Sequence, residues 1–367
     1  MNELVLTDNS SGGPLQLAWD QMRPDDLSTL MRQGWLRGVR LEQDPNVQIT
    51  ISRFMREFIS HLENRATRTA RQLRCMWFQF EAWCREKELT SLPAELETVK
   101  RYLSQRALDK HRNTLGMDRW AISRIHQECG CPDPTADRTI RNMLGDYTRD
   151  KVLNGETIKQ ATPLREYHLD ELDRMWGNSP VLADRRDLAL LTLAYETLLR
   201  AAEVARVKLN HLTMKPDGSA VLTIPLTKTN VSGDPDVTIL SRQAMRLIRE
   251  YFSLAGRVFD TKLDDPLFAG INPEGCSVKR VRHLGYSTVL RIFTRASTVL
   301  AVEELGIPPF TAHSCRVGAA QDLAASGENA LKIMMSGRWK SEVMVMKYCR
   351  SIFAEEGAMA KRRANRS

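Results

Sequence analysis

The chain has 367 residues, of which 42% are hydrophobic and 27% are charged. This length predicts two domains of ordinary size, and the apolar content is sufficient for packed cores. The 53 basic residues outnumber the 45 acidic ones, and the net charge of +8 favours a polyanionic partner without proving one.

Several protein classes are disfavoured by composition. The longest apolar stretch, 187–199, is too short for a membrane span. The seven cysteines are irregularly spaced, as expected in a reducing cytoplasm, and the N-terminus lacks the basic start and apolar core of a signal peptide. Cys129 and Cys131 near His126 hint at a metal, but no second Cys/His pair stands at zinc spacing. We therefore expect no metal and no cofactor, and a cytoplasmic location.

Residues 1–45 are expected to form a flexible arm. The segment 9–14 has the Ser, Gly and Pro content of a linker, and 25–36 is expected to form a short helix. The sequence assigns no function to this arm.

Residues 46–150 have helical periodicity throughout. One helix carries an apolar stripe at spacings of three and four. The stripe consists of Leu73, Met76, Trp77, Phe80, Trp83 and Cys84. The opposite face carries Arg65, Arg68, Arg71 and Arg74, with no acidic residue between Glu63 and Glu81. This face is either an ordinary solvated surface or one that follows a phosphate backbone.

Further helices are expected in this region, including one with its N-cap at Thr114 and one over 135–147. Arg112, Arg119 and Arg124 lie on or just before the helix capped by Thr114. Residues 51–160 contain 20 basic and 15 acidic residues. Most of the excess positive charge therefore falls in this helical module.

A polar linker over 151–163 is expected to precede a second domain over 164–350. A nearly all-apolar helix is predicted from Asp184 to Leu199. It ends beside Arg200 and Glu203, which form either a structural ion pair or part of a functional site, because unpaired buried charge is costly.

The segment 211–240 is the clearest β region, with a turn at 216–218 and Lys228 just beyond the second strand. A later helix begins near Tyr286. Its first turn and the residues before it offer polar and basic side chains that suit a helix end entering a major groove, although an ordinary amphipathic helix fits equally well. These candidate DNA-binding residues are Arg282, Tyr286, Ser287 and Arg291.

The most informative stretch lies near the C-terminus. Pro308 and Pro309 precede a helix start with Thr311 as the expected N-cap and His313 in the first turn. Arg316 shares the face of His313, and a guanidinium there can bind phosphate bidentately. A single His-x-x-Arg pair is usually unremarkable, as is a single tyrosine. The ordered set of His313, Arg316, Trp339 and Tyr348 nevertheless indicates DNA strand-transfer chemistry.

Together with the upstream residues, this set resembles a known family. The residues Arg200, Glu203, Lys228, His313, Arg316, Trp339 and Tyr348 resemble the active site of the tyrosine site-specific recombinases of the phage integrase family, especially its Cre-like members. The segments 197–206, 227–229, 313–320 and 357–359 carry the likeness, which covers about 46–360. Arg338 is a departure, because Cre-like proteins usually have glycine there. The region 286–291 also matches poorly, so a different target site is expected.

The resemblance implies a mainly α fold, with an all-helical DNA-binding domain and a mostly α catalytic domain with a small antiparallel sheet. It implies that Tyr348 is the nucleophile, that Arg200 and Arg316 hold the phosphate charge, and that His313 and Trp339 donate hydrogen bonds. Lys228 would protonate the leaving oxygen, and Glu203 would orient its neighbours. The intermediate would be a 3′-phosphotyrosine, which needs neither ATP nor metal.

The resemblance also implies a homotetramer, in which the two domains of each protomer hold double-stranded DNA between them. The tetramer would act on two inverted-repeat target sites through a Holliday junction, in a bacterial, phage or plasmid setting. A tail over 351–367 would dock on the neighbouring protomer. Two alternatives remain open: a type IB topoisomerase-like enzyme that religates its own strand, and a noncatalytic DNA-binding regulator with the same fold.

Overall fold

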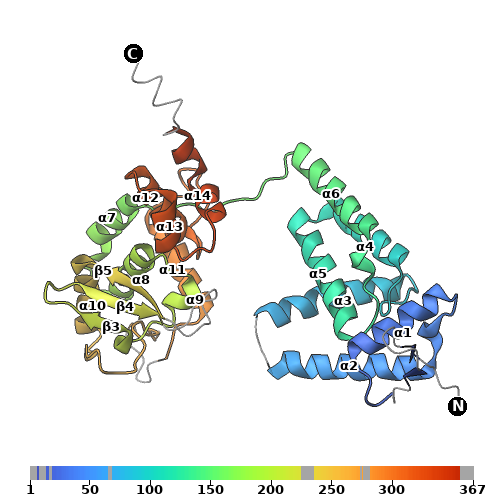
Figure 1. The fold of residues 1–367 in the computed structure, drawn as a ribbon. Helices are drawn as coiled ribbons and strands as arrows, with labels where there is room; N and C mark the ends of the chain where they lie inside the picture. Colours follow the sequence, from blue (N-terminus) through green and yellow to red (C-terminus); the bar gives the residue numbers. More distant parts are fainter. Residues whose placement is uncertain are drawn as a thin grey trace. The chain divides into compact units, whose positions relative to one another are not determined.

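The computed structural model describes residues 6–7, 14–15, 19–64, 68–224, 235–272, 275 and 282–355. The chain divides into two compact units, Met1–Ile158 and Lys159–Ser367, and each has its own hydrophobic core (Figure 1). The division lies inside the predicted linker over 151–163, whose first residues belong to the last helix of the first unit.

Among its described residues, the first unit combines helices with one short pair of strands. Strands β1 (Leu6–Thr7) and β2 (Pro14–Leu15) pair antiparallel. The helices are α1 (Pro24–Leu36), α2 (Pro45–Asn64), α3 (Arg68–Glu86), α4 (Leu96–Asp109), α5 (Arg112–Glu128) and α6 (Arg138–Leu153). Helix α5 begins earlier than predicted, because the His111 side chain, not Thr114, caps it by accepting the Asn113 N–H.

Helix α3 carries the predicted apolar stripe into two clusters of the core. Leu73 is buried with residues of α1, α2 and α5, while Phe80 and Cys84 are buried with residues of α4, α5 and α6. Trp77 packs against both clusters and contacts the Phe80 ring at a centroid distance of 5.5 Å. The predicted stripe is therefore confirmed, and α3 organises the helical unit.

The expected flexible arm is wrong for residues 19–45. In α1, Leu27 and Met31 are fully buried, and they pack with residues of α2, α3 and α5. Gly130 has a φ of +68°, and a Cβ there would come within 2.7 Å of the Pro24 carbonyl oxygen, so a glycine is needed for the close approach of α1. The short helix expected over 25–36 is present as α1, but its burial against the other helices was not predicted.

This packing predicts a stability effect. Leu27→Ala should lower the free energy of unfolding of the helical unit by roughly 2–5 kcal/mol, because it removes fully buried methyl groups and leaves a cavity. Urea denaturation followed by circular dichroism measures the change. Leu36→Ala, at a side chain that is 88% exposed, is the matched control and should change stability little. Equal effects of the two substitutions would contradict a packed α1.

The second unit combines helices with a small sheet. Its early elements are α7 (Glu166–Trp176), α8 (Leu182–Thr197), α9 (Ala201–Val204), β3 (Leu212–Met214), β4 (Ala220–Ile224), β5 (Asp236–Leu240) and α10 (Arg242–Leu254). The later elements are α11 (Tyr286–Val299), α12 (Ser314–Ala325), α13 (Ala330–Ser336) and α14 (Val343–Glu355). The strands form an antiparallel sheet in the order β3-β4-β5. The predicted fold class, mainly α with a small antiparallel sheet, is confirmed.

Helix α8 lies at the centre of this unit (Figure 1). Its middle part, 188–194, is apolar apart from Thr192 because other elements cover it, and Leu188, Leu190 and Leu193 are fully buried. Helix α12 packs beside it, and the Leu164 N–H donates to the Ser314 carbonyl oxygen at 3.0 Å. A Cβ at Gly318 would lie 1.8 Å from the Leu164 carbonyl oxygen, so only glycine permits this approach.

The last helix extends further than the sequence suggested. Helix α14 continues to Glu355, and Ile352 and Phe353 pack against the cluster formed by α12, α13 and α14. The expected boundary of a docking tail at residue 351 is therefore corrected, since 351–355 belong to the fold. The segment 356–367 lies outside the described residues. Within the described ranges, no helix has both the length and the apolarity needed to cross a bilayer.

Candidate active site

Most of the predicted catalytic residues gather where the C-terminal end of α8 meets α12, α13 and α14. This group comprises Arg200, Glu203, Arg316, Trp339 and Tyr348. Lys228 lies outside the described residues. Three segments that are distant in the sequence therefore converge on one location.

Arg316 is the most constrained member of the group. Arg316 is only 2% exposed. Its Nη1 donates to the Leu198 carbonyl oxygen, and its Nη2 donates to the Gly337 carbonyl oxygen at 2.8 Å. Its guanidinium lies 4.9 Å from the centroid of the Trp339 ring. Burial, aided by the nearby charges of Arg200 and Arg338, lowers the pKa of Arg316 to about 10. The side chain is still charged at neutral pH and is fixed before any substrate binds.

Arg200 and Glu203 form the predicted ion pair. Helix α8 ends at Leu198 in a left-handed conformation, with φ of +49°, and Arg200 becomes the N-cap of the short helix α9. The Glu203 carboxylate accepts from the Arg200 Nη1 and from the Arg200 backbone N–H, each at 2.8 Å. Glu203 therefore fixes both the side chain and the backbone of Arg200.

Tyr348 lies against Trp339, with ring centroids 5.5 Å apart and an interplanar angle of 61°. Burial raises the pKa of the Tyr348 hydroxyl, and the charges of Arg316 and Arg200 oppose that increase. Both arginines are thus close enough to act on the hydroxyl electrostatically. A Cβ at Gly337 would come within 2.3 Å of the Trp339 ring, so glycine is required for the ring to lie here.

His313 lies on the surface at the start of α12. The helix begins at Ser314 with His313 as its N-cap, so the expected N-cap at Thr311 is wrong by two residues. The Thr311 N–H donates to the Ser314 Oγ at 2.8 Å, and the His313 N–H donates to the Thr311 Oγ1 at 3.3 Å. The His313 residue is exposed at this helix start.

The predicted groove-reading residues lie together near α9. Arg282, Tyr286, Ser287 and Arg291 are exposed, and the last three belong to α11. The His283 Nδ1–H donates to the Ala205 carbonyl oxygen at 3.1 Å, which links this segment to the end of α9. A hollow of about 480 Å³ beside it is lined by Tyr286 and also by Arg206. Arg206, which was not among the predicted site residues, is exposed three residues after Glu203.

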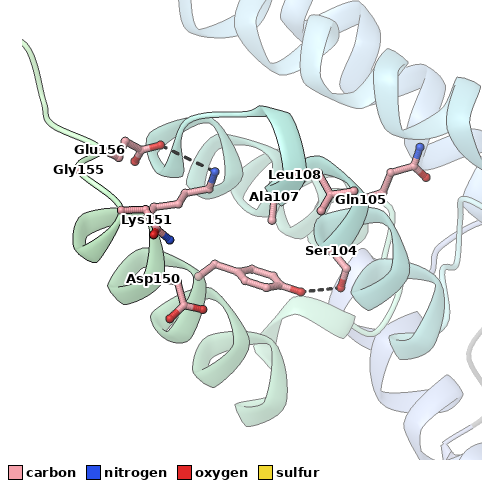
Figure 2. A pocket seen from close by; sticks show the side chains of 10 residues that line it. Ser104, Gln105, Ala107, Leu108, Asp150, Lys151, Gly155 and Glu156 are labelled. Carbon is pink, nitrogen blue, oxygen red and sulfur yellow. Dashed lines mark hydrogen bonds and ion pairs between the residues drawn. The ribbon is translucent and has the colours of Figure 1, made fainter.

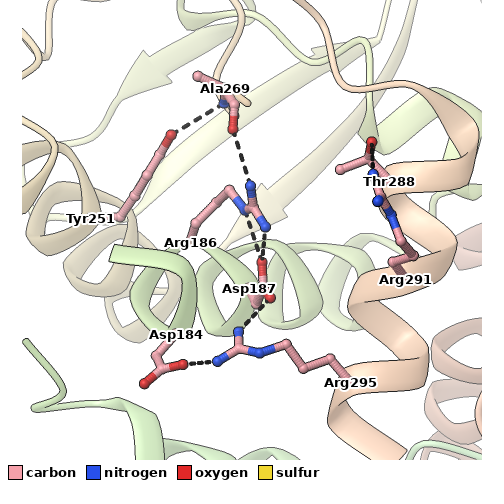
Figure 3. A network of polar contacts seen from close by, with 8 residues as sticks. All are labelled: Asp184, Arg186, Asp187, Tyr251, Ala269, Thr288, Arg291 and Arg295. Atoms are coloured by element: carbon pink, nitrogen blue, oxygen red, sulfur yellow. Dashed lines mark hydrogen bonds and ion pairs between the residues drawn. The ribbon is translucent and has the colours of Figure 1, made fainter. Parts of the chain in front are cut away.

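A polar network anchors α11 to α8 (Figure 3). Arg295 of α11 pairs with both Asp184 and Asp187, at 2.7 Å from the latter, while Arg186 pairs with Asp187 and donates to the Ala269 carbonyl oxygen. Burial raises the pKa of Asp187 to about 6 despite Arg186. On the outer face, Arg291 contacts Thr288. The inner face of α11 is therefore fixed, and the outer face presents polar groups.

The predicted DNA-binding arginines of the helical unit differ in their surroundings. Arg68, Arg71 and Arg74 are exposed on α3, and Arg74 lies 3.5 Å from Glu63. Arg65 lies outside the described residues. Exposure of this face fits a phosphate-following surface and equally an ordinary solvated one.

The arginines of α5 are more restricted. Arg112 interacts with Glu156 through its backbone N–H and its side chain, which ties the start of α5 to the segment after α6. Arg124 pairs with Glu128 at 2.5 Å, and Arg119 is half-buried. The Arg112 guanidinium therefore has an intramolecular role that the sequence did not reveal.

The helical unit also contains features that do not bear on this site. A hollow of about 810 Å³ is lined by residues of α4, α6 and the segment after α6 (Figure 2). Tyr147 donates to Ser104 there at 2.8 Å.

The candidate metal ligand His126 is engaged within the helical unit. The His126 Nε2 accepts from the Ala94 N–H, and its Nδ1–H donates to the Ile122 carbonyl oxygen. Both ring nitrogens are occupied, which leaves His126 unsuited to bind metal with Cys129 and Cys131.

Similar proteins identify the family to which this chain belongs. Residues 168–355 match the model of the phage integrase family. The recombinase Cre of Escherichia phage P1 is 29% identical over 296 residues, covering 76% of this chain and 83% of Cre. An integrase/recombinase XerD homolog of Selenomonas ruminantium is 24% identical over 319 residues, covering 85% and 88% of the two chains.

A solved structure shows the same fold. The XerH site-specific recombinase bound to a palindromic difH substrate, in a post-cleavage complex, aligns with a TM-score of 0.53 at 14% identity, covering 85% of this chain and 94% of XerH. The family match spans the elements that carry Arg200, Arg316 and Tyr348. The chain belongs to the phage integrase family and is a tyrosine recombinase, an enzyme that cleaves and rejoins DNA strands.

Proposed function

We propose that this recombinase exchanges strands between two specific DNA sites, with Tyr348 as its nucleophile. The observation that carries the proposal is the preformed arrangement around Tyr348. Arg316 is fixed by two backbone carbonyls, Arg200 is fixed by Glu203, and both act on the Tyr348 hydroxyl electrostatically. A phosphodiester beside Tyr348 would meet charges that need little rearrangement, which is the main requirement for stabilising a phosphoryl-transfer transition state.

The chemistry follows from these groups. The Tyr348 oxygen attacks the phosphorus while the hydroxyl proton passes to a general base, for which His313 is the proposed residue. The bond from phosphorus to the 5′ oxygen breaks, and a 3′-phosphotyrosine forms. Arg200 and Arg316 neutralise the nonbridging oxygens, to which His313 and the Trp339 indole N–H donate. Lys228 protonates the departing 5′ oxygen. A 5′-hydroxyl from the partner strand reverses the step, so the phosphodiester energy is conserved.

A trapping experiment tests this chemistry. On a nicked suicide substrate the 5′ fragment diffuses away, so a denaturing gel should show the protein covalently attached to DNA. A noncatalytic regulator would give no adduct.

A recombination assay separates the two catalytic alternatives. With two full sites, strand exchange should give recombinant products, whereas a topoisomerase-like enzyme would only nick and reseal one duplex. Products that join DNA from the two sites would support strand exchange. Resealing of each duplex alone would favour the topoisomerase alternative.

Lys228 can be tested separately as the general acid. Lys228→Ala should slow cleavage of ordinary DNA strongly, yet cleave nearly normally a substrate with sulfur in place of the bridging 5′ oxygen. Sulfur leaves without a proton, so the acid is then dispensable. Quench-flow cleavage rates on the two substrates measure the rescue. An unchanged defect on the sulfur substrate would assign the acid role to another group.

We propose further that the enzyme works as a homotetramer through a Holliday junction, with the segment 356–367 docking on the neighbouring protomer. The apolar Ala358 and Met359 within this segment fit an amphipathic contact in a groove. Each protomer would give one segment and accept one, a heterologous contact that can close into a ring.

A truncation after Glu355 tests the docking and spares Ile352 and Phe353, which pack within their own unit. The shortened protein should still occupy one half-site as a monomer. Gel-shift titrations should show loss of cooperative filling of a full inverted-repeat site and of synapsis. If instead it assembles normally and loses affinity only in a salt-dependent manner, the segment is a DNA contact.

Both units are proposed to contact DNA. In the helical unit the exposed Arg68, Arg71 and Arg74 of α3 are suited to phosphates, and in the catalytic unit Tyr286, Ser287 and Arg291 are suited to base edges and the backbone. Since the relatives come from a phage and a bacterium, we propose that the enzyme acts on DNA in the bacterial cytoplasm.

A further inference from the structure

Arg338 lies between Gly337 and Trp339 in an uncommon backbone conformation. Its φ of +51° is in the left-handed region that favours glycine. A side chain is strained in this conformation, because its Cβ comes too close to the following carbonyl oxygen. The side chain of Arg338 must therefore contribute something that a glycine would not.

The guanidinium of Arg338 contacts the end of α8. Its Nη2 donates at 2.8 Å to the carbonyl oxygen of Thr197, the last residue of that helix. Arg316 donates to the next carbonyl, that of Leu198, and to the Gly337 carbonyl. Unpaired carbonyls at a helix C-terminus favour cations. The turn 337–339 and the end of α8 are therefore joined by two guanidiniums.

The charges around Arg338 belong to the candidate active site. Burial lowers its pKa, while Glu203 and Asp236 raise it and Arg200 lowers it. Arg338 in turn lowers the pKa of Arg316. The guanidiniums of Arg200, Arg316 and Arg338 therefore lie close to the single carboxylate of Glu203, while Asp236 acts on Arg338. This arrangement leaves excess positive charge where the scissile phosphate is proposed to bind.

One donor of Arg338 is held at a cost. Its Nε is buried and, among the described residues, has no hydrogen-bond partner. Such a donor has given up its hydrogen bond to water without gaining another, which destabilises the fold. Backbone strain and an unpaired polar atom therefore coincide in one residue, next to Trp339.

We propose that Arg338 is a positioning residue for strand cleavage. Its guanidinium holds the end of α8, and with it the Arg200–Glu203 pair, against the turn that carries Trp339. The spacing between Arg200 and Arg316, which repel each other in the absence of an anion, is thereby set before DNA binds. This inference rests on the proposed role of these residues in cleavage.

Arg338→Gly gives the sharpest test, because it removes the side chain and relieves the backbone strain together. We expect a thermal midpoint equal to or above that of the parent protein and nearly unchanged affinity for a half-site. Single-turnover formation of the covalent adduct should slow by roughly ten- to a hundredfold, the scale of a small misplacement of reacting groups. Arg338→Lys, which can still donate to the Thr197 carbonyl, should cleave faster than the glycine variant.

Arg257→Met is the matched control. Arg257 also donates to backbone carbonyls, those of Pro266 at 2.6 Å and Leu267 at 3.0 Å, but contributes no candidate catalytic group. Its loss should lower the thermal midpoint and leave the adduct rate per folded molecule unchanged.

Two results would overturn the inference while leaving the proposed function intact. One is Arg338→Gly cleaving at the parent rate, and the other is a parallel loss of binding and cleavage, which would make Arg338 a DNA contact. A parent protein that forms no adduct at all would overturn the proposed function, and the role of Arg338 with it.

Discussion

Replacing Tyr348 with phenylalanine should abolish the covalent protein–DNA adduct while leaving DNA binding nearly unchanged. The substitution removes only the hydroxyl, and the ring can keep its contact with Trp339 at a centroid distance of 5.5 Å. No other group is proposed to supply the attacking oxygen. Denaturing gels with a suicide substrate measure the adduct, and gel shifts on the same DNA measure binding.

Tyr286 provides the matched tyrosine control, since it is 48% exposed on α11 and has no proposed catalytic role. Tyr286→Phe should retain the adduct. An adduct that persists in Tyr348→Phe and disappears in Tyr286→Phe would assign the nucleophile to Tyr286.

The second large effect concerns Arg316. Arg316→Ala should slow cleavage by roughly a hundredfold or more, the scale of losing a preorganised charge donor. Arg316→Lys keeps a positive charge, but an ammonium lacks the planar fork that reaches the Leu198 and Gly337 carbonyls together, so it should rescue the rate poorly. Single-turnover cleavage at saturating DNA separates this defect from a change in affinity.

Stability must be measured beside the rate. Arg316→Ala leaves two buried carbonyls unpaired, at a cost of roughly 1–3 kcal/mol each, so thermal melting and half-site binding establish how much protein is folded. Losses of binding and cleavage in equal proportion would make Arg316 a contact that positions DNA rather than one that stabilises the transition state.

The candidate site residues were predicted from their spacing along the sequence and from the resemblance to the tyrosine recombinases. The His-x-x-Arg spacing, the Arg200–Glu203 spacing and the apolar stripe of α3 follow from helical periodicity. Helix boundaries were less accurate, as with His313 in place of Thr311 at the N-cap of α12 and the extension of α14 to Glu355.

Contacts between distant segments were not predictable in the same way. Arg338 reaches Thr197 across 141 positions, and only the fold shows that this departure from glycine lies at the end of α8. The burial of α1 and the use of Arg112 to hold Glu156 likewise depend on tertiary packing. Such packing overrides local composition, which had suggested a flexible arm and a free phosphate contact.

The most direct test of the account is identification of the residue that becomes linked to DNA. The adduct from a suicide substrate is digested with nuclease and protease, and the modified peptide is sequenced by mass spectrometry. We predict a nucleotide attached through its 3′ phosphate to the oxygen of Tyr348, within a peptide of α14. Attachment to another residue, or through a 5′ phosphate, would contradict the account.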